Sequence, residues 1–206
     1  MSYVEVYTDG SAFGNARRNK HARAGVGVWF ADDYPLNVSE DLLEHFSGPC
    51  TNQRAELAAC VRAIEQWQVL RSESGLDYGL MIRSDSMYSI NTVTKWARNW
   101  EKRGWRKANG QPVENLDLVQ RLWKLVQKSD HIEFKHVAAH AGVYGNEMAD
   151  RLAKAGAGYE EDVFEEGTLI LRVEDAREEA TYEELFLESQ GLTETDSGNE
   201  NHVFWF

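Results

Sequence analysis

The order of periodic segments along the chain is the feature that most constrains its fold. Residues 3–7, 23–30 and 42–48 read as short strands joined by loops, an order that favours an antiparallel meander. Residues 51–67 then repeat apolar side chains at helical spacing, and residues 80–85 form another short strand pattern. Because a strand reached through a helix normally runs parallel to its neighbour, we expect a sheet of mixed direction.

The second half of the chain continues this alternation. Residues 86–96 and 113–127 have helical patterns, residues 131–137 alternate like a strand, and residues 146–156 form a helix that Gly156 ends. The predicted fold class is therefore α/β, with a five-stranded mixed sheet flanked by helices.

The acidic charge of the chain is concentrated at its C-terminal end. Of 34 acidic and 22 basic residues in the 206-residue chain, 15 acidic and 2 basic residues lie in the segment 157–206. The first 156 residues therefore carry a balance of +1, which leaves a nucleic-acid partner possible despite the net charge of −12. We predict a domain over residues 1–157 and an acidic extension over residues 158–206.

Composition and targeting signals indicate a globular protein without a membrane segment. Hydrophobic residues make up 42% of the chain, and neither a run long enough to span a bilayer nor a secretory signal is evident. We expect an intracellular location, cytoplasmic or nuclear. Cys50 and Cys60 should be reduced thiols, because one helical stretch between them would hold them about 15 Å apart.

Four acidic residues occur at positions that the predicted fold would bring together. Asp9 and Asp85 each follow a predicted strand, and Glu56 and Asp150 lie early in predicted helices. Parallel strands end at the same edge of a sheet, where open α/β sheets bind their ligands. Carboxylates so close would need cations, and hard oxygen ligands favour Mg²⁺ or Mn²⁺. On its own, Asp9-Gly10 is equally a hairpin-turn signal.

Four sequence blocks, in order, resemble the signature segments of the type 1 ribonuclease H family. They are YTDGS (7–11), TNQRAEL (51–57), SDSMYSIN (84–91) and HAGVYGNEMADRLAKAGA (140–157). The resemblance implies a ribonuclease H-like fold and an endonuclease that hydrolyses the RNA strand of RNA/DNA hybrids. It also implies two Mg²⁺ ions, for which Mn²⁺ could substitute, and products with 5′-phosphate and 3′-hydroxyl ends.

The resemblance assigns roles to individual residues. The catalytic set, in which the four acids also bind the metal ions, is Asp9, Glu56, Asp85, His140 and Asp150. Contacts to the RNA strand fall to Asn15, Asn52, Gln53 and Glu56. Contacts to the DNA strand fall to Thr51, Trp96, Trp100 and Asn115.

Several of these residues have ordinary structural alternatives. Asn52 could cap the helix that begins there, and Asn15 and His140 could be loop residues. Trp96 and Trp100, four apart, could form a buried helix face, although the basic residues interleaved between positions 95 and 107 favour exposure on a DNA-binding protrusion. Pro49 stands where the family has a phosphate-contacting Arg, so either the affinity for DNA phosphate is weaker or another residue, such as Arg54 or Lys107, supplies that contact.

The ends of the chain carry further expectations. Because the resemblance begins almost at Met1, we expect neither an N-terminal hybrid-binding domain nor a mitochondrial leader. In the extension, residues 167–174 read as a strand and 181–191 as a helix, followed by an apolar HVFWF end. The extension could fold back on the basic protrusion, bind a protein partner, or only add stability.

Two other readings of the whole protein stay open. One is a non-catalytic module that binds RNA/DNA hybrids, and the other is the ribonuclease H domain of a reverse transcriptase. The presence of all four acids and His140 argues against the non-catalytic module. The start of the resemblance at Met1 and the complete basic protrusion favour a free-standing enzyme, which we expect to be monomeric. Primers, R-loops and DNA replication intermediates are all candidate substrates.

Overall fold

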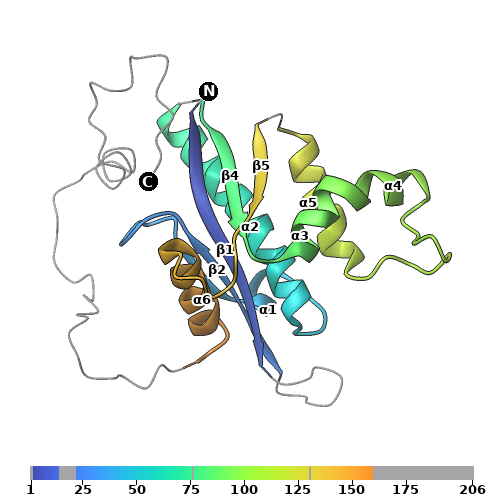
Figure 1. Cartoon of the computed structure of the whole chain (residues 1–206), viewed down its shortest axis with the longest axis horizontal. Helices are drawn as coiled ribbons and strands as arrows, with labels where there is room; N and C mark the ends of the chain where they lie inside the picture. The colour runs from blue at the N-terminus through green and yellow to red at the C-terminus, as the bar shows by residue number, and fades with distance from the viewer. Residues whose placement is uncertain (1, 14–21, 76, 130, 160–206) are drawn as a thin grey trace.

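The computed structural model describes residues 2–13, 22–75, 77–129 and 131–159 (Figure 1). Five strands form one sheet in the order β3-β2-β1-β4-β5. Their bounds are β1 (Tyr3–Phe13), β2 (Arg23–Trp29), β3 (Val38–Asp41), β4 (Gly79–Ser84) and β5 (Ile132–His136). The helical elements are α1 (Leu42–His45), α2 (Asn52–Ser74), α3 (Met87–Asn91), the π-helical turn η1 (Thr92–Trp96), α4 (Ala97–Lys102), α5 (Leu116–Gln127) and α6 (Tyr144–Gly156).

The strand directions confirm the predicted mixed sheet. Strand β1 runs antiparallel to β2, and β2 runs antiparallel to β3, as a meander requires. Strands β1 and β4 are parallel, and β4 and β5 are also parallel. Helix α2 provides the crossover from the meander to β4, and the helices from α3 to α5 provide the crossover to β5.

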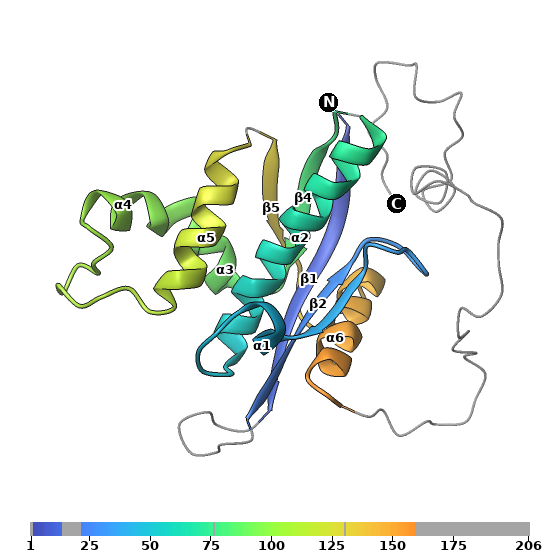
Figure 2. The same cartoon turned by 180° about the vertical axis from the view of Figure 1, so that it is seen from behind.

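Glycines let one helix approach each face of the sheet. Gly10 faces α2, where an added Cβ would lie 2.2 Å from the backbone N of Glu56. Gly27 faces α6, where an added Cβ would lie 2.1 Å from the carbonyl O of Ala149. Since Gly27 is the cross-strand partner of Asp9, and adjacent strand residues face opposite sides, Asp9 faces the α6 side. The two views in Figures 1 and 2 show α6 and α2 on opposite faces.

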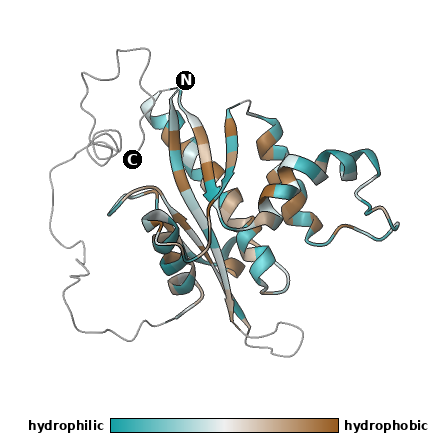
Figure 3. Cartoon of the chain, in the orientation of Figure 1, coloured by the Kyte–Doolittle hydropathy of each residue, from teal (hydrophilic) through white to brown (hydrophobic). Residues whose placement is uncertain are grey.

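The core lies between the sheet and helices α2 and α5. Its largest fully buried side chains include Trp67, Phe30, Leu57, Ile64 and Leu122. Hydrophobic residues gather on the strands and on α5, whereas α4 is mainly hydrophilic (Figure 3). None of the helices in the described ranges combines the length and apolar composition that a membrane crossing requires. Cys50 and Cys60 are both buried free thiols, as expected.

The third strand differs from its predicted position. It covers Val38–Asp41, and the predicted strand 42–48 is instead the short helix α1 followed by a loop. The side chain of Asp41 accepts from the backbone N of Leu43, and Glu44 accepts from the backbone N of Asp41. This capping box starts a helical turn and outweighs the weak alternation of the following residues.

The predicted extension 158–206, apart from its first two residues, lies outside the described residues. The strand predicted at 167–174 and the helix at 181–191 are therefore untested, and the division into domain and extension stays a prediction.

Candidate active site

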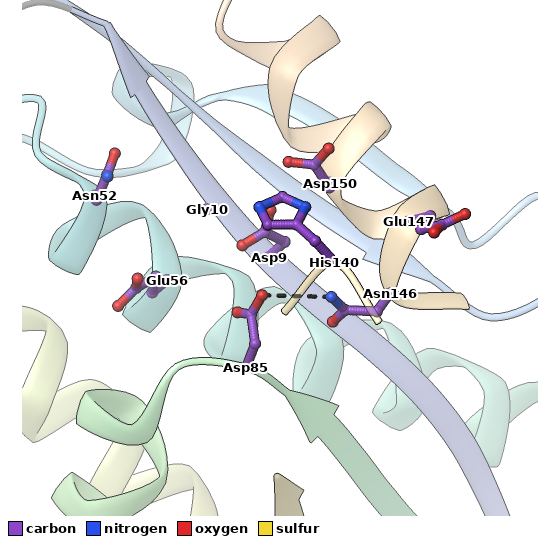
Figure 4. Close-up of a pocket in the computed structure, with 9 residues that line it drawn as sticks. All are labelled: Asp9, Gly10, Asn52, Glu56, Asp85, His140, Asn146, Glu147 and Asp150. Atoms are coloured by element: carbon purple, nitrogen blue, oxygen red, sulfur yellow. Dashed lines mark hydrogen bonds between the residues drawn. The ribbon is translucent and has the colours of Figure 1, made fainter. Parts of the chain in front are cut away.

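All five predicted catalytic residues line one cavity of about 330 Å³ (Figure 4). The cavity opens where β4 ends beside the continuing strand β1, with α2 and α6 on either side. Its lining residues are Asp9, Gly10, Asn52, Glu56, Asp85, His140, Asn146, Glu147 and Asp150.

The position of Asp9 corrects one part of the prediction. Asp9 lies inside β1, paired with Gly27, and not at the end of the strand. The parallel pairing of β1 with β4 stops at Thr8 and Ser84, so Asp9 and Asp85 are the next residues on the two strands. The alternative of an Asp-Gly hairpin turn is wrong, because strand pairing continues to Phe13. The early end of β4, and not the end of β1, therefore exposes Asp9 to the cavity.

Three of the four carboxylates accept a hydrogen bond from a neighbouring side chain. Ser86 Oγ donates to Glu56 Oε2 at 2.5 Å. Asn146 Nδ2 donates to Asp85 Oδ2 at 3.3 Å, as the dashed line in Figure 4 shows. Lys154 Nζ donates to Asp150 Oδ2 at 2.5 Å.

Burial and mutual repulsion disfavour ionisation of the central carboxylates. Burial, and after it the negative charges of Asp85, Asp150 and Glu56, raise the pKa of Asp9 to about 7, although a backbone hydrogen bond from Gly10 acts in the opposite direction. Burial also raises the pKa of Glu56; the bond from Ser86 lowers it, and Asp85 raises it further. A cation in the cavity would relieve the repulsion that these shifts report.

The donor chemistry of the cavity fits a hard divalent cation. Four carboxylates supply the oxygen ligands that Mg²⁺ and Mn²⁺ prefer, and Asp9, between the others, has its pKa raised by their charges. In the described ranges, no three or more His, Cys, Asp or Glu side chains form a group that could already hold a metal ion. Three of the four acids are directed toward neighbouring side chains and not toward one common point. Their donors are Ser86, Asn146 and Lys154.

His140 approaches the cavity from the loop between β5 and α6. It is exposed, and its backbone adopts a left-handed conformation with φ 51°. Gly142, two residues later, is also left-handed with φ 75°. The loop between the strand and the helix therefore turns tightly beside the four acids, and His140 is both a turn residue and a cavity-lining residue.

Of the residues predicted to contact RNA, Asn52 and Gln53 lie in the first turn of α2, and Glu56 lies one turn further along it. Asn52 is exposed and lines the cavity beside Glu56, and Gln53 is exposed next to it. The helix N-cap is Thr51 and not Asn52, because Thr51 Oγ1 accepts from the backbone N of Arg54 at 3.4 Å. Asn15 lies outside the described residues.

Two of the residues predicted to contact DNA, Asn115 and Trp96, lie beside Tyr88, and a third, Trp100, lies beside Trp96. Asn115 Nδ2 donates to the Tyr88 hydroxyl at 3.3 Å, and the ring of Tyr88 lies 6.1 Å from that of Trp96. The rings of Trp96 and Trp100 are 5.5 Å apart. Both tryptophans are half-buried, so the expected exposure holds only in part: Trp100 packs against the core while α4 projects from the body (Figure 1).

Of the two residues suggested as substitutes for the missing Arg at Pro49, Arg54 is buried, whereas Lys107 pairs with Glu114 at the surface. Arg54 is only 4% exposed, and its guanidinium donates to Asp117 Oδ1 at 2.8 Å and Oδ2 at 2.6 Å. Lys107 Nζ donates to Glu114 at 2.8 Å. The guanidinium of Arg54 instead joins α2 to α5, because Asp117 belongs to the first turn of α5.

Sequence reasoning missed the residues that support the acids. Asn146 and Glu147 line the cavity, and Ser86 and Lys154 hold acidic side chains. One signal was present: Asn146 and Lys154 lie four residues before and after Asp150, so all three share one face of α6. Asn146 is 4% exposed, and its Oδ1 has no hydrogen-bond partner in the described part of the chain.

The mixed sheet with an acid-lined cavity beside its central strand is a ribonuclease H-like architecture. The family model for RNase H matches residues 1–158, so the chain belongs to the RNase H family, as the sequence blocks predicted. Ribonuclease H1 of Homo sapiens is 42% identical over 160 residues, which are 78% of this chain and 52% of that protein. Ribonuclease H of Maricaulis maris is 37% identical over 156 residues, which are 76% of this chain and 94% of that protein.

Solved structures show the same fold. LC9-RNase H1, a type 1 RNase H with the type 2 active-site motif, has a TM-score of 0.58 and 28% identity, over 76% of this chain and 72% of that one. The foamy viral protease-reverse transcriptase in complex with RNA/DNA hybrid has a TM-score of 0.57 and 20% identity, over 74% of this chain and 20% of that one. The chain spans about half the length of the human, mouse and rat Ribonuclease H1 relatives.

Proposed function

We propose that this protein is an endonuclease that hydrolyses the RNA strand of RNA/DNA hybrids, leaving 5′-phosphate and 3′-hydroxyl ends. One observation carries the proposal: four carboxylates from β1, α2, the end of β4 and α6 line a single cavity. Membership of the RNase H family and the names of the relatives support the same activity.

The four acids would hold two divalent cations, Mg²⁺ or Mn²⁺. Bound there, the cations would stabilise negative charge on the scissile phosphate and lower the pKa of the attacking water. The protein itself supplies the fixed arrangement of the acids: Gly10 brings α2 against β1 beside Asp9, and Gly27 brings α6 against β2 beside it. Asp9, with Asp85 next to it beyond the parallel pairing, is the central ligand of this proposal.

His140 is the proposed proton-carrying group. It is exposed and lines the cavity together with the four acids (Figure 4). An imidazole can exchange a proton with the leaving oxygen or with water near neutral pH. Its position also suits a role in the release of the cleaved product.

Recognition of the RNA strand falls to polar groups beside the acids. Only RNA carries 2′-hydroxyls, which are displayed in the shallow minor groove of a hybrid. Asn52 and Gln53 are exposed at the start of α2, and Glu56 lies one turn further into the cavity. We assign contacts with 2′-hydroxyls to these three residues and to Asn15.

Recognition of the DNA strand falls to the surface around η1 and α4. Trp96 and Trp100 offer half-exposed ring faces, and the exposed side chains of Lys95, Arg98 and Lys102 surround them. Stacking surfaces combined with positive charge suit a single DNA backbone. Thr51 and Asn115, at the starts of α2 and α5, are the proposed phosphate contacts.

The activity is tested by incubation with labelled RNA/DNA, RNA/RNA and DNA/DNA duplexes, each in Mg²⁺ and in EDTA. We expect cleavage of the RNA strand of the hybrid alone, in Mg²⁺ alone. Asp9→Asn should abolish cleavage and keep hybrid affinity, whereas Asp33→Asn, at an exposed loop position, should cleave like the wild type. Wild-type cleavage by Asp9→Asn would refute the assignment of the site. Hybrid binding without cleavage by the wild-type protein would instead indicate a non-catalytic binding module.

The acidic extension is the proposed regulator of hybrid binding. Its excess of negative charge complements the basic surface around α4, where it would compete with a nucleic-acid backbone. Deletion of residues 160–206 should tighten hybrid binding and steepen its dependence on salt. Unchanged affinity and slope would refute this self-inhibition and leave a protein partner or a purely stabilising role. A monomeric state and an intracellular location stay predictions.

A further inference from the structure

One of the three side-chain hydrogen bonds to the cavity acids comes from a positively charged group. Ser86 and Asn146 are neutral donors to Glu56 and Asp85. Lys154 donates to Asp150 through an ammonium group, so this contact is an ion pair. Of the three donors, only the ammonium of Lys154 would repel a cation that approaches the same carboxylates.

The ion pair is formed within α6 and close to the cavity. Lys154 follows Asp150 by four residues, which places the two side chains on the same face of the helix. Lys154 Nζ lies 2.5 Å from Asp150 Oδ2, and the side chains are 39% and 23% exposed. The charge of Asp9 acts on Lys154 as well as that of Asp150, so the ammonium lies in the electric field of the acidic cavity.

We propose that Lys154 is an internal cation that occupies Asp150 in the ion-free protein, and that a divalent cation must displace it to bind. This inference rests on the proposed metal-dependent function. Asp150 Oδ2 can serve the ammonium or a metal ion, but both positive charges at one oxygen would repel each other. Lys154 therefore sets how tightly the cavity binds Mg²⁺ and limits binding at low ion concentration.

The opposite role is also physically reasonable and predicts the opposite result. If Lys154 only oriented Asp150 for the metal, its removal would free the carboxylate to rotate and would weaken metal binding. If Lys154 competes with the metal, its removal makes metal binding tighter. The sign of the change in metal affinity therefore separates the two roles, whatever happens to stability.

The test is calorimetric titration of the full chain with MgCl₂ and with MnCl₂, without nucleic acid. Three variants are compared with the wild type: Lys154→Gln, which removes the charge, Lys154→Arg, which keeps it, and Arg151→Gln. Arg151 is an exposed cation on the same helix whose guanidinium contacts the sulfur of Met148, so it controls for the general loss of one charge.

We expect Lys154→Gln to bind Mg²⁺ about two- to fivefold more tightly, the equivalent of one solvent-accessible ion pair. Lys154→Arg and Arg151→Gln should bind like the wild type. In EDTA, Lys154→Gln should also unfold at a lower temperature, and added Mg²⁺ should raise that temperature more than in the wild type.

Equal or weaker Mg²⁺ binding by Lys154→Gln would overturn the inference and leave the proposed function intact. An equal gain in Mg²⁺ affinity by Arg151→Gln would also overturn it, because the gain would then come from the loss of any positive charge on α6 and not from the ion pair with Asp150. Absence of divalent-cation binding by the wild-type protein would overturn the proposed metal-dependent function itself.

Discussion

Removal of the charge on Asp9 should stabilise the ion-free protein. Burial and the neighbouring carboxylates raise the pKa of Asp9 from its ordinary value of 3.8 to about 7. The folded state therefore resists the negative charge that the unfolded chain accepts freely. Asp9→Asn keeps the shape of the side chain and removes that charge, so it should remove the cost of ionisation.

The size of the effect follows from the difference between the two pKa values. A shift of about 3 units, at ~1.4 kcal/mol per unit, corresponds to about 4 kcal/mol. Since the cavity is open to solvent and to ions, which screen the charges, we expect ~2–4 kcal/mol of extra stability for Asp9→Asn at pH 8.

The pH dependence has a definite sign and range. Toward the acid end of the range, Asp9 is mostly protonated in both states, and the two proteins should be nearly equally stable. Between pH 4 and 7 the unfolded state ionises first, so the wild type should lose stability relative to Asp9→Asn. Above pH 7 Asp9 is ionised in both states, and the difference should stay constant.

The assay is urea unfolding at pH 3.5 to 8.5 in EDTA, followed by circular dichroism. Asp117→Asn is a control of opposite sign, because a hydrogen bond from Arg54 lowers the pKa of Asp117. That variant should be less stable than the wild type at neutral pH, and the difference should begin to shrink only at the acid end of this range, where the unfolded state takes up the proton. Parallel pH profiles for Asp9→Asn and the wild type would refute the raised pKa of Asp9 and the cost of its ionisation in the folded protein.

Three further substitutions test the packing around the site. Gly10→Ala would place a Cβ 2.2 Å from the backbone N of Glu56, so α2 must move by about 1 Å. We expect the free energy of unfolding in urea to fall by ~1–3 kcal/mol and kcat to fall about 100-fold. A wild-type kcat would contradict this expectation. Thr51→Ala removes the N-cap of α2 and should cost ~1 kcal/mol, whereas Thr51→Ser should keep the cap; equal stability of the two variants in thermal unfolding would argue against it. Leu122→Ala, fully buried in α5, should cost ~2–5 kcal/mol while kcat, measured where the variant is folded, stays unchanged.

The predicted acids were found together because their positions follow from local patterns. Each lies beside a strand or helix whose period is visible in the sequence, and the parallel relation of β1 and β4 follows from the helix between them. Their direct partners were not predicted in the same way. Asn146 reaches Asp85 across 61 residues, and Ser86 reaches Glu56 across 30.

The misplaced features have equally local explanations. The strand expected at 42–48 is a helix because Asp41 and Glu44 form a capping box, a signal that was present in the sequence and was not used. The role suggested for Arg54 failed for a different reason. An arginine in an exposed first turn and an arginine buried against Asp117 look identical in the sequence, and only the approach of α5 decides between them.

The sequence by itself determined the α/β alternation, the family and the identity of the four acids, because hydrophobic period and ordered motifs are properties of neighbouring residues. The tertiary structure decided that Asp9 lies inside a strand, that Trp96 and Trp100 are half-buried, and that Ser86, Asn146 and Lys154 hold the acids. These features depend on where one strand or helix ends beside its neighbour, and on which side chains of different elements are then close enough to interact. That geometry is set by the packing of distant segments, which no local pattern records.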